Sequence, residues 1–362
     1  MIAIPDPHNN KNLTRREFII SSGLAIGSFT ITGGLCQACS LFGNKEKQEN
    51  LAIEFIGPEG YFPFYKNIFK RIKKVSLYYK TLEEALFTES NAAIVLTPIA
   101  QKASVILVLL EMGKDILTPF PLATDYIEFD AIQKQCNMMN CRLAMLDPIR
   151  YTETVKSIRK FISDNHAGKI HSVDILVDPD YHESNYYPYI EGFCGIGTSF
   201  VRLISYILGR NPISLTTKDF EAVNLLKSDK KVSLELDFNG ITVSYKKEYT
   251  EQEWTIMISG KKTDLVFDST GQVKASIETD TFHNLKQQDE YKADAFTKNI
   301  QDFIVSIRNR KEPEVNTQDG MAGIALNLAA VMSARTGSSV KMIMDHYGKC
   351  EDERWVKTSK VY

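Results

Sequence analysis

The segment 91–124 constrains the fold of this 362-residue chain more than any other part of it. Residues 92–96 form a short apolar run closed by Thr97-Pro98, which is typical of a strand buried on both faces. Residues 101–112 are long enough for a helix, and Gly113 supplies the left-handed residue that ends it. A second strand then begins at Asp115. Strand, helix and strand predict a parallel, right-handed βαβ unit.

The carboxyl ends of these two strands are where we expect function. In open parallel sheets, ligands lie outside the carboxyl ends of the strands. In this chain those ends are the loops Thr97-Pro98 and Thr118–Pro121, and the prolines of the second loop exclude helix there. The sequence therefore predicts an α/β fold with functional residues at these loops.

The composition is that of a soluble globular protein, with 43% hydrophobic and 24% charged residues. The length predicts about two domains plus appendages. A net charge of -2 gives no electrostatic reason to expect nucleic acid or an anionic membrane as partner. The six cysteines are too few for a disulfide scaffold, and Cys36-x-x-Cys39 has no second pair at zinc spacing. We therefore predict no metal site.

The sequence at the amino terminus predicts that the protein is exported. Arg15-Arg16 precedes the moderately apolar run 19–35, and the pair resembles a twin-arginine signal. The run is too short and too polar for a stable membrane span. We expect a signal segment over 1–40 and a linker over 41–50, with a periplasmic or lipid-anchored product. Cleavage near residue 38 and lipidation at Cys36 or Cys39 both stay open, and the alternative is a basic tail without a targeting role.

The turn after the first predicted strand, 51–56, departs from a dinucleotide-binding turn. Such a turn reads G-x-G-x-x-G, because backbone amides must approach a pyrophosphate at a helix start. Counting from Gly57, the second and third glycine positions are Glu59 and Phe62. Glu59 would set a carboxylate beside phosphate, which is repulsive. The next strand ends in Tyr78-Tyr79-Lys80, where an acidic residue would bind an adenosine ribose.

Three segments together resemble one known family. They are T-L-E-E-A-L at 81–86, N-A-A-I-V-L-T-P at 91–98 and L-L-E-M-G-K-D-I-L-T-P-F-P-L-A-T at 109–124. In order and spacing they are similar to the amino-terminal domain of the glucose-fructose oxidoreductase/inositol dehydrogenase (Gfo/Idh/MocA) family. The segment 311–342, which includes Asp319-Gly320 and Ser333, resembles the family's closing signature.

The resemblance implies two domains and a cofactor. We expect a Rossmann-like domain over 51–146 that binds NAD or NADP, unless this chain has lost it. An α/β domain over 147–362 would follow, with a predominantly antiparallel open sheet. Sugars and polyols are the family's usual substrates, and its second sheet commonly makes dimer contacts, so a homo-oligomer is expected. The cofactor contacts would fall on Gly57, Thr97-Pro98 and Pro121.

Three positions that carry the family's chemistry differ here. The lysine of its Glu-Lys-Pro motif falls on Phe120, which has no titratable proton. In the segment 192–209 its histidine and aspartate fall on Ser199 and Arg202. Serine cannot shuttle a proton near neutral pH without a base, and arginine is always charged. Their joint replacement leaves the catalytic residues unknown. Lys102, near another family histidine position, is interpreted as a solvated lysine at a helix start, with a substitute cation as the alternative.

Four residues are candidates for substrate binding. Arg150 and Tyr151 follow a predicted strand at the domain junction, where an interdomain salt bridge and packing are the equal alternative. Arg202 could hold a carboxylate or phosphate with two hydrogen bonds. Tyr187 lies in the aromatic segment 178–190, which could stack on a sugar face or form an irregular surface loop.

Residues 213–273 change to period-two alternation, which predicts antiparallel strands with one packed face. Asn239-Gly240 predicts a hairpin turn between two of them. This pattern agrees with the second domain that the resemblance implies.

Three functions remain open on this sequence. The first is an exported NAD(P)-dependent oxidoreductase acting on a sugar-like substrate. The second is a catalytically inactive relative that binds a saccharide or a protein. The third is a non-redox, glycosidase-type enzyme that retains its cofactor. That enzyme would need new acid and base groups, for which the nearest candidates are Asp178, Asp180, His182, Tyr187 and Glu191.

Overall fold

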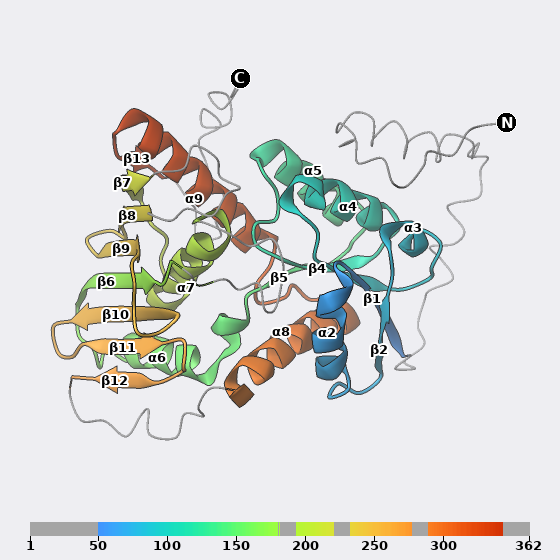
Figure 1. Cartoon of the computed structure of the whole chain (residues 1–362), viewed down its shortest axis with the longest axis horizontal. Coiled ribbons are helices and arrows are strands. Elements are labelled where there is room, and N and C mark those ends of the chain that lie inside the picture. Colours follow the sequence, from blue (N-terminus) through green and yellow to red (C-terminus); the bar gives the residue numbers. More distant parts are fainter. Residues whose placement is uncertain (1–49, 180, 182–192, 221–231, 277–288, 343–362) are drawn as a thin grey trace. The chain divides into compact units, whose positions relative to one another are not determined.

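A computed structural model describes residues 50–179, 181, 193–220, 232–276 and 289–342 (Figure 1). The predicted signal segment, the linker, Tyr187 and the acid/base candidates Asp180, His182 and Glu191 lie outside the described residues. Within that part of the chain, no helix is long and apolar enough to cross a membrane. Nor does it bring together three or more His, Cys, Asp or Glu side chains in a way that could hold a metal ion.

The first sheet, sheet A, is parallel and five-stranded, in the order β2-β1-β3-β4-β5. Its strands are β1 (Leu51–Ile56), β2 (Val75–Tyr79), β3 (Ala92–Val95), β4 (Asp115–Pro119) and β5 (Leu143–Leu146). Every residue of β3, β4 and β5 is buried, as expected for strands of a sheet covered on both faces.

Helices cover both faces of sheet A (Figure 1). On one face lie α4 (Ile99–Glu111) and α5 (Tyr126–Met138), and on the other α2 (Phe62–Phe69) and α8 (Asp289–Asn309). Successive strand residues belong to separate hydrophobic clusters, with Ala93 and Val95 in one and Ile94 in the other. Gly113, at φ 75°, follows α4 as predicted. The expected βαβ unit is therefore confirmed.

The second sheet, sheet B, has eight strands in the order β12-β11-β10-β6-β9-β8-β7-β13. Only the β6–β9 pair is parallel. The strands are β6 (Ile170–Val177), β7 (Ser214–Phe220), β8 (Val232–Asp237), β9 (Thr242–Lys247), β10 (Trp254–Gly260), β11 (Leu265–Asp268), β12 (Val273–Ala275) and β13 (Val340–Lys341). Asn239 and Gly240 form the predicted β8–β9 turn, with φ values of 55° and 83°. The predicted fold class, a parallel sheet followed by a mostly antiparallel one, is confirmed.

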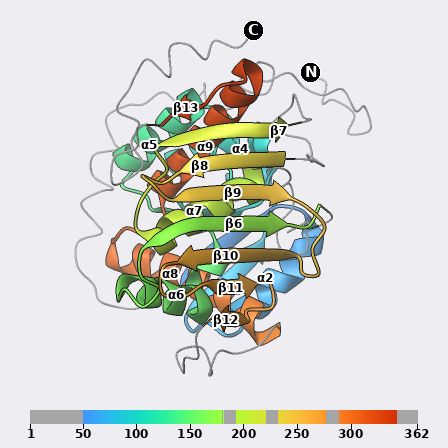
Figure 2. The ribbon, with the colours of Figure 1, turned by 90° about the vertical axis from the view of Figure 1, so that its left-hand side faces the viewer.

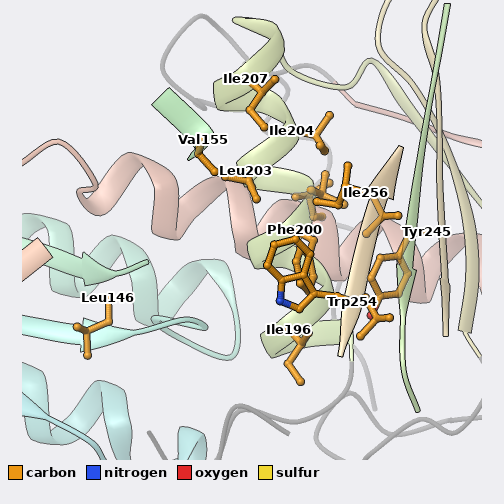
Figure 3. Packing of buried hydrophobic residues seen from close by; sticks show 14 of the residues in the cluster. Leu146, Val155, Ile196, Phe200, Leu203, Ile204, Ile207, Tyr245, Trp254 and Ile256 are labelled. Atoms are coloured by element: carbon orange, nitrogen blue, oxygen red, sulfur yellow. The ribbon is translucent and has the colours of Figure 1, made fainter. Parts of the chain in front are cut away.

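One face of sheet B packs on helices, and the other is open in Figure 2. The helices are α6 (Glu153–Ser163), α7 (Thr198–Leu208) and α9 (Thr317–Thr336). Between α7 and the sheet, the Phe200 ring lies 5.4 Å from that of Trp254, which contacts Phe267 at 6.0 Å (Figure 3). Strand residues alternate between buried and partly exposed, because only one face meets the helices.

The chain returns to sheet A at the start of α9. Ala144 in β5 forms an isolated antiparallel bridge with Asn316, and the amide of Met145 donates to the Val315 carbonyl at 2.9 Å. The amino-terminal end of α9 thus lies beside the carboxyl end of β5, next to the loops where the sequence predicts function.

Candidate functional site at the carboxyl edge of sheet A

The loops after β3 and β4 lie side by side, as the sequence predicts. The Thr118 hydroxyl donates to the Val95 carbonyl at 2.9 Å and ties the two strand ends together. Phe120 is buried, and a Cβ placed on Gly323 of α9 would meet its ring at 3.4 Å. The Phe120-Pro121 peptide is cis. The aromatic ring at the family's lysine position therefore packs against α9.

Lys102 of α4 is buried beneath the β4 loop, so its interpretation as a solvated lysine is wrong. Its Nζ donates to the carbonyls of Pro119 at 3.1 Å and Pro121 at 2.9 Å. The side chain is 2% exposed, and burial lowers the pKa of Lys102 to about 7. A neutral amine still carries two N–H bonds, enough for both carbonyls. The lysine holds this loop on both sides of Phe120.

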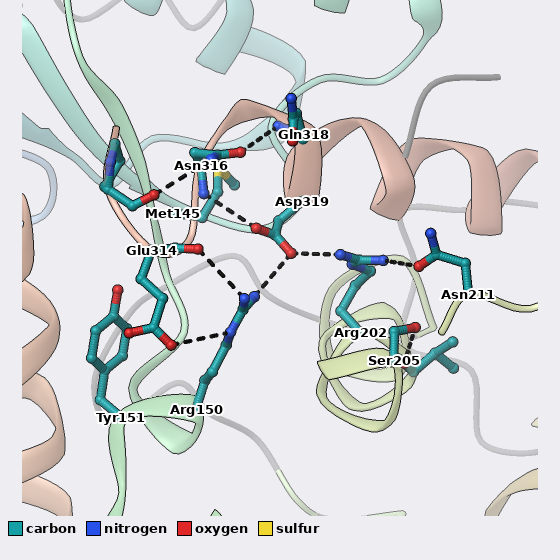
Figure 4. Close-up of polar contacts among 12 residues, drawn as sticks. Met145, Arg150, Tyr151, Arg202, Ser205, Asn211, Glu314, Asn316, Gln318 and Asp319 are labelled. Atoms are coloured by element: carbon teal, nitrogen blue, oxygen red, sulfur yellow. Dashed lines mark hydrogen bonds and ion pairs between the residues drawn. The ribbon is translucent and has the colours of Figure 1, made fainter. Parts of the chain in front are cut away.

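Arg150, Arg202 and Asp319 meet at this edge and are called the Asp319 cluster (Figure 4). Arg150 Nη1 lies 2.9 Å from Asp319 Oδ1, and Arg202 Nη2 lies 2.6 Å from the same oxygen. The three side chains are 11%, 13% and 7% exposed, in that order. They come from the turn η2 (Pro148–Tyr151), from α7 and from the first turn of α9. One carboxylate thus joins three elements distant in sequence.

Further contacts fix the Asp319 cluster. Asp319 Oδ2 accepts from the Asn316 amide at 3.3 Å, which completes a capping box at the start of α9. Arg202 donates to Asn211 at 2.9 Å, and Arg150 Nε lies 3.8 Å from a Glu314 oxygen. Burial raises the pKa of Asp319, but the two guanidiniums outweigh it and hold this pKa below its usual range. The carboxylate is therefore ionised at neutral pH.

Arg150 and Tyr151 make the salt bridge and packing that the sequence left open as an alternative, but their partners Asp319 and Asp302 lie in the same predicted domain, 147–362. Arg150 is committed to the Asp319 cluster. The Tyr151 hydroxyl donates to Asp302 of α8 at 2.7 Å, and the side chain is buried. Burial, with Asp302 beside it, raises the pKa of Tyr151 far above its usual range. These contacts connect η2 to α8 and α9, and any substrate contact by these two residues stays a prediction.

Ser199 and Asp178, two further residues considered for chemistry, lie in separate elements of the structure. Ser199 is half-buried in the first turn of α7, three residues before Arg202. Asp178 follows β6, its amide donates to the Glu253 carbonyl at 3.0 Å, and its Oδ2 accepts from the Thr250 amide at 3.4 Å. That carboxylate therefore ties the end of β6 to the loop between β9 and β10.

The β1–α2 turn does not fit a pyrophosphate. Pro58 and Pro63 have no N–H, and the amides of Tyr61 and Phe62 donate to the carbonyls of Pro58 and Glu59. The Phe62 ring, at the third glycine position, lies 5.7 Å from the Phe55 ring and 5.6 Å from the Tyr79 ring. A phosphate cradle needs several free amides and close backbone approach, and it excludes a carboxylate such as Glu59.

Gly57, Thr97, Pro98 and Pro121, the expected cofactor contacts, lie at this edge, and any cofactor contact by them stays a prediction. Gly57 allows close approach of the two loops, since a Cβ there would lie 2.8 Å from the Leu96 Cβ. The Thr97 hydroxyl is buried and makes no hydrogen bond within the described part of the chain. Pro98 caps α4, and Pro121 accepts from Lys102. The Thr97 oxygen is thus a buried polar group at the β3 loop whose hydrogen-bonding capacity the described residues leave unused.

Sequence reasoning missed two of these residues. Lys102 gave no signal of burial, because α4 is apolar around most of its circumference. Asp319 did have a local signal, since N-x-x-D from Asn316 is a capping box before a helix. Its pairing with two arginines far away in the chain had none.

Neither the family models nor the curated proteins include a match to this chain. Solved structures do match. An oxidoreductase from Agrobacterium radiobacter, in complex with NAD+, L-tartaric acid and magnesium, aligns with a TM-score of 0.68 at 14% identity, covering 81% of this chain and 98% of the other. The WlbA dehydrogenase from Bordetella pertussis, in complex with NADH and UDP-GlcNAcA, gives 0.67 at 16%, covering 82% and 99%.

A third structure agrees with these two. Myo-inositol 2-dehydrogenase from Lactobacillus plantarum aligns with a TM-score of 0.67 at 15% identity, covering 82% of this chain and 100% of the other. At such low identity the likeness shows the fold alone. The chain has the two-sheet fold of sugar and polyol oxidoreductases.

Proposed function

We propose that this chain, which has a Gfo/Idh/MocA-like fold, binds a neutral sugar- or polyol-type ligand at the carboxyl edge of sheet A without nicotinamide-dependent redox chemistry. The observation that carries the proposal is the β1–α2 turn. Its prolines, its internally bonded amides, Glu59 and the packed Phe62 ring leave no cradle for a dinucleotide pyrophosphate. The fold supports a nicotinamide-type cofactor by resemblance, but the residues of the β1–α2 turn do not fit its pyrophosphate.

The charge at the edge supports a neutral ligand. The cations Arg150 and Arg202 are balanced by Asp319 and Glu314 at the ion-pair distances given above. A ligand carboxylate or phosphate would have to displace a buried protein carboxylate, which costs its hydrogen bonds and leaves a charge to be solvated. A ligand hydroxyl that reaches the buried Thr97 oxygen would, in contrast, break no hydrogen bond of the described residues.

The cofactor half of the proposal is tested by calorimetric titration of NAD+, NADH, NADP+ and NADPH into the purified chain, with a scan for nicotinamide absorbance beforehand. We expect no binding tighter than about 1 mM. As a matched variant, Glu59→Gly with Phe62→Gly restores the two glycine positions and should gain affinity. Micromolar binding by the unmodified chain would refute the proposal and favour an active oxidoreductase.

The ligand half is tested with a panel of neutral sugars and polyols, including myo-inositol and glycerol, in thermal-shift and calorimetric assays. Thr97→Val should weaken the best binder about tenfold with little change in stability, because its hydroxyl has no protein partner. Thr118→Val is the control, since that hydroxyl bonds the Val95 carbonyl and its loss should affect stability. Equal ligand affinity in the wild type and Thr97→Val would contradict this placement.

Turnover of the bound ligand without any nicotinamide would instead support the third interpretation, a non-redox enzyme. Of its candidate groups within the described residues, Asp178 is engaged with the loop between β9 and β10. We therefore rank the non-redox enzyme below ligand binding without redox chemistry as the function of this chain.

We also propose export and self-association. Export rests on the twin arginines, and replacing Arg15 and Arg16 by lysine should move the chain from the periplasmic to the cytoplasmic fraction. Self-association rests on the open face of sheet B (Figure 2). Met257→Glu, on that face, should shift a dimer to monomer in light scattering. Met112→Glu, at the end of α4, should not.

A further inference from the structure

A groove lies at the far end of α7 from Ser199. It is bounded by the carboxyl-terminal ends of α6 and α7, by the turn leading into β6 and by the β8–β9 turn. Its volume is about 460 Å³. That size is typical of sites for small organic molecules. The groove shares no residue with the Asp319 cluster or with the loops of sheet A.

The rim of this groove is basic. Arg159, Lys169 and Arg210 line it, and no aspartate or glutamate does. Within the described residues, none of these three side chains forms an ion pair or hydrogen bond. The Arg159 guanidinium instead lies over the Tyr206 ring, with Cζ 4.0 Å from its centroid. The rim therefore offers three cationic groups whose side-chain hydrogen-bond donors are not used by the described part of the chain.

The floor of the groove is apolar. Ile170, Ile207 and Ile241 are buried there, and Ile162 and Leu208 are half-buried. Basic residues near helix carboxyl termini are common, because they compensate the negative ends of helix dipoles. That compensation accounts for the sign of the charge, but it accounts for neither the cavity nor an apolar floor beneath the cations.

We propose that this basic groove binds a small organic anion. A carboxylate, sulfate or phosphate group would be held by Arg159, Lys169 and Arg210, and a planar or aliphatic body would cover the isoleucine floor. Arginine presents paired N–H donors to such oxygens, and desolvation by the body strengthens the charge-assisted hydrogen bonds. Charge complementarity and the size of this half-open groove favour a small molecule over an acidic protein segment, which would need a larger contact area.

The probes are 2-naphthoate, 2-naphthyl phosphate and the neutral 2-naphthamide, titrated by calorimetry at low salt and again at high salt. We expect both anions to bind at least ten times more tightly than the amide and to weaken with salt. The ratio of the dissociation constants of the two anions identifies carboxylate or phosphate as the preferred group. Equal binding of all three probes, or no binding of the anions at millimolar concentration, overturns the proposal.

Two sets of variants locate the site. Lys169→Gln with Arg210→Gln should weaken naphthoate binding at least tenfold, whereas Lys274→Gln with Lys311→Gln, the same charge change at exposed positions away from the groove, should leave it unchanged. Ser163→Phe fills the groove from the end of α6 and should abolish binding while circular dichroism stays native. Equal losses in both double variants would show a non-specific charge effect and refute the site. Binding of an acidic peptide but not of the small anions would refute the small-molecule assignment.

Discussion

Lys102→Met should change how the stability of this protein depends on pH. The substitution keeps the length of the buried side chain but removes the amine that donates to the Pro119 and Pro121 carbonyls. Leaving two buried carbonyls without a donor costs about 1 to 3 kcal/mol each, at every pH. The test uses a second contribution of Lys102 to the free energy of unfolding, one that varies with pH.

That term follows from the lowered pKa. Burial lowers the pKa of Lys102 from 10.5 to about 7. Between these two values the unfolded chain binds a proton that the folded chain does not, so the free energy of unfolding rises with pH. Full titration would contribute about 5 kcal/mol, at 1.36 kcal/mol per pH unit. From about pH 6 to about pH 8.5 the gain is about 2 kcal/mol.

The assay is urea denaturation of the wild type and Lys102→Met at intervals across that pH range. The free energy of unfolding of the wild type minus that of Lys102→Met should grow by about 2 kcal/mol toward alkaline pH. The contributions of the other titrating groups are the same in both proteins and cancel in this difference. Lys134→Met is the control, because the ordinary pKa of a lysine, 10.5, already lies above this range and a hydrogen bond with Asp130 raises the pKa of Lys134 further. A difference that stays constant, or falls with pH, would refute the buried, neutral lysine.

Three further predictions concern stability and reactivity. Asp319→Asn leaves two buried guanidiniums without their shared carboxylate and should lower the free energy of unfolding by about 3 to 5 kcal/mol in urea. Because the pKa of Asp319 is held low, the carboxylate's contribution should be present above about pH 4 and lost as pH falls further. Gly260→Ala places a Cβ 2.3 Å from a backbone oxygen and should lower the free energy of unfolding by about 1 to 3 kcal/mol. Gly60→Ala, whose Cβ would have no heavy atom within 4 Å, should lower it by less than about 0.5 kcal/mol in the same assay. Burial raises the thiol pKa of Cys136 and Cys141 to about 12, so iodoacetamide near neutral pH should label them only after unfolding, as peptide mapping would show.

The fold was predictable from local patterns in the sequence. The segment 91–124 places β3, α4 and β4 within one or two residues of their observed bounds, because its apolar runs, its glycine and its prolines act over short distances. The hairpin at Asn239-Gly240 was predictable for the same reason. Local signals of this kind require no knowledge of what packs against the element.

The site was less predictable, because its contacts join residues far apart in the chain. Arg150 and Arg202 could be named from the sequence, but their common partner Asp319 lies 169 and 117 residues further on. The rotation of α4 that buries Lys102 is set by packing on both sides of the helix, and an almost uniformly apolar helix does not reveal its inward face.

The Asp319 cluster has a consequence for what can enter the edge of sheet A. Asp319 is fixed beside both arginines by the start of α9, so it acts as an intramolecular competitor at an effective concentration on the order of millimolar or above. A free anion at lower concentration cannot replace it. The two proposed sites would therefore divide ligands by charge, with hydroxylated neutral molecules at the sheet edge and anions at the basic groove, and one protein could sense both without cross-inhibition.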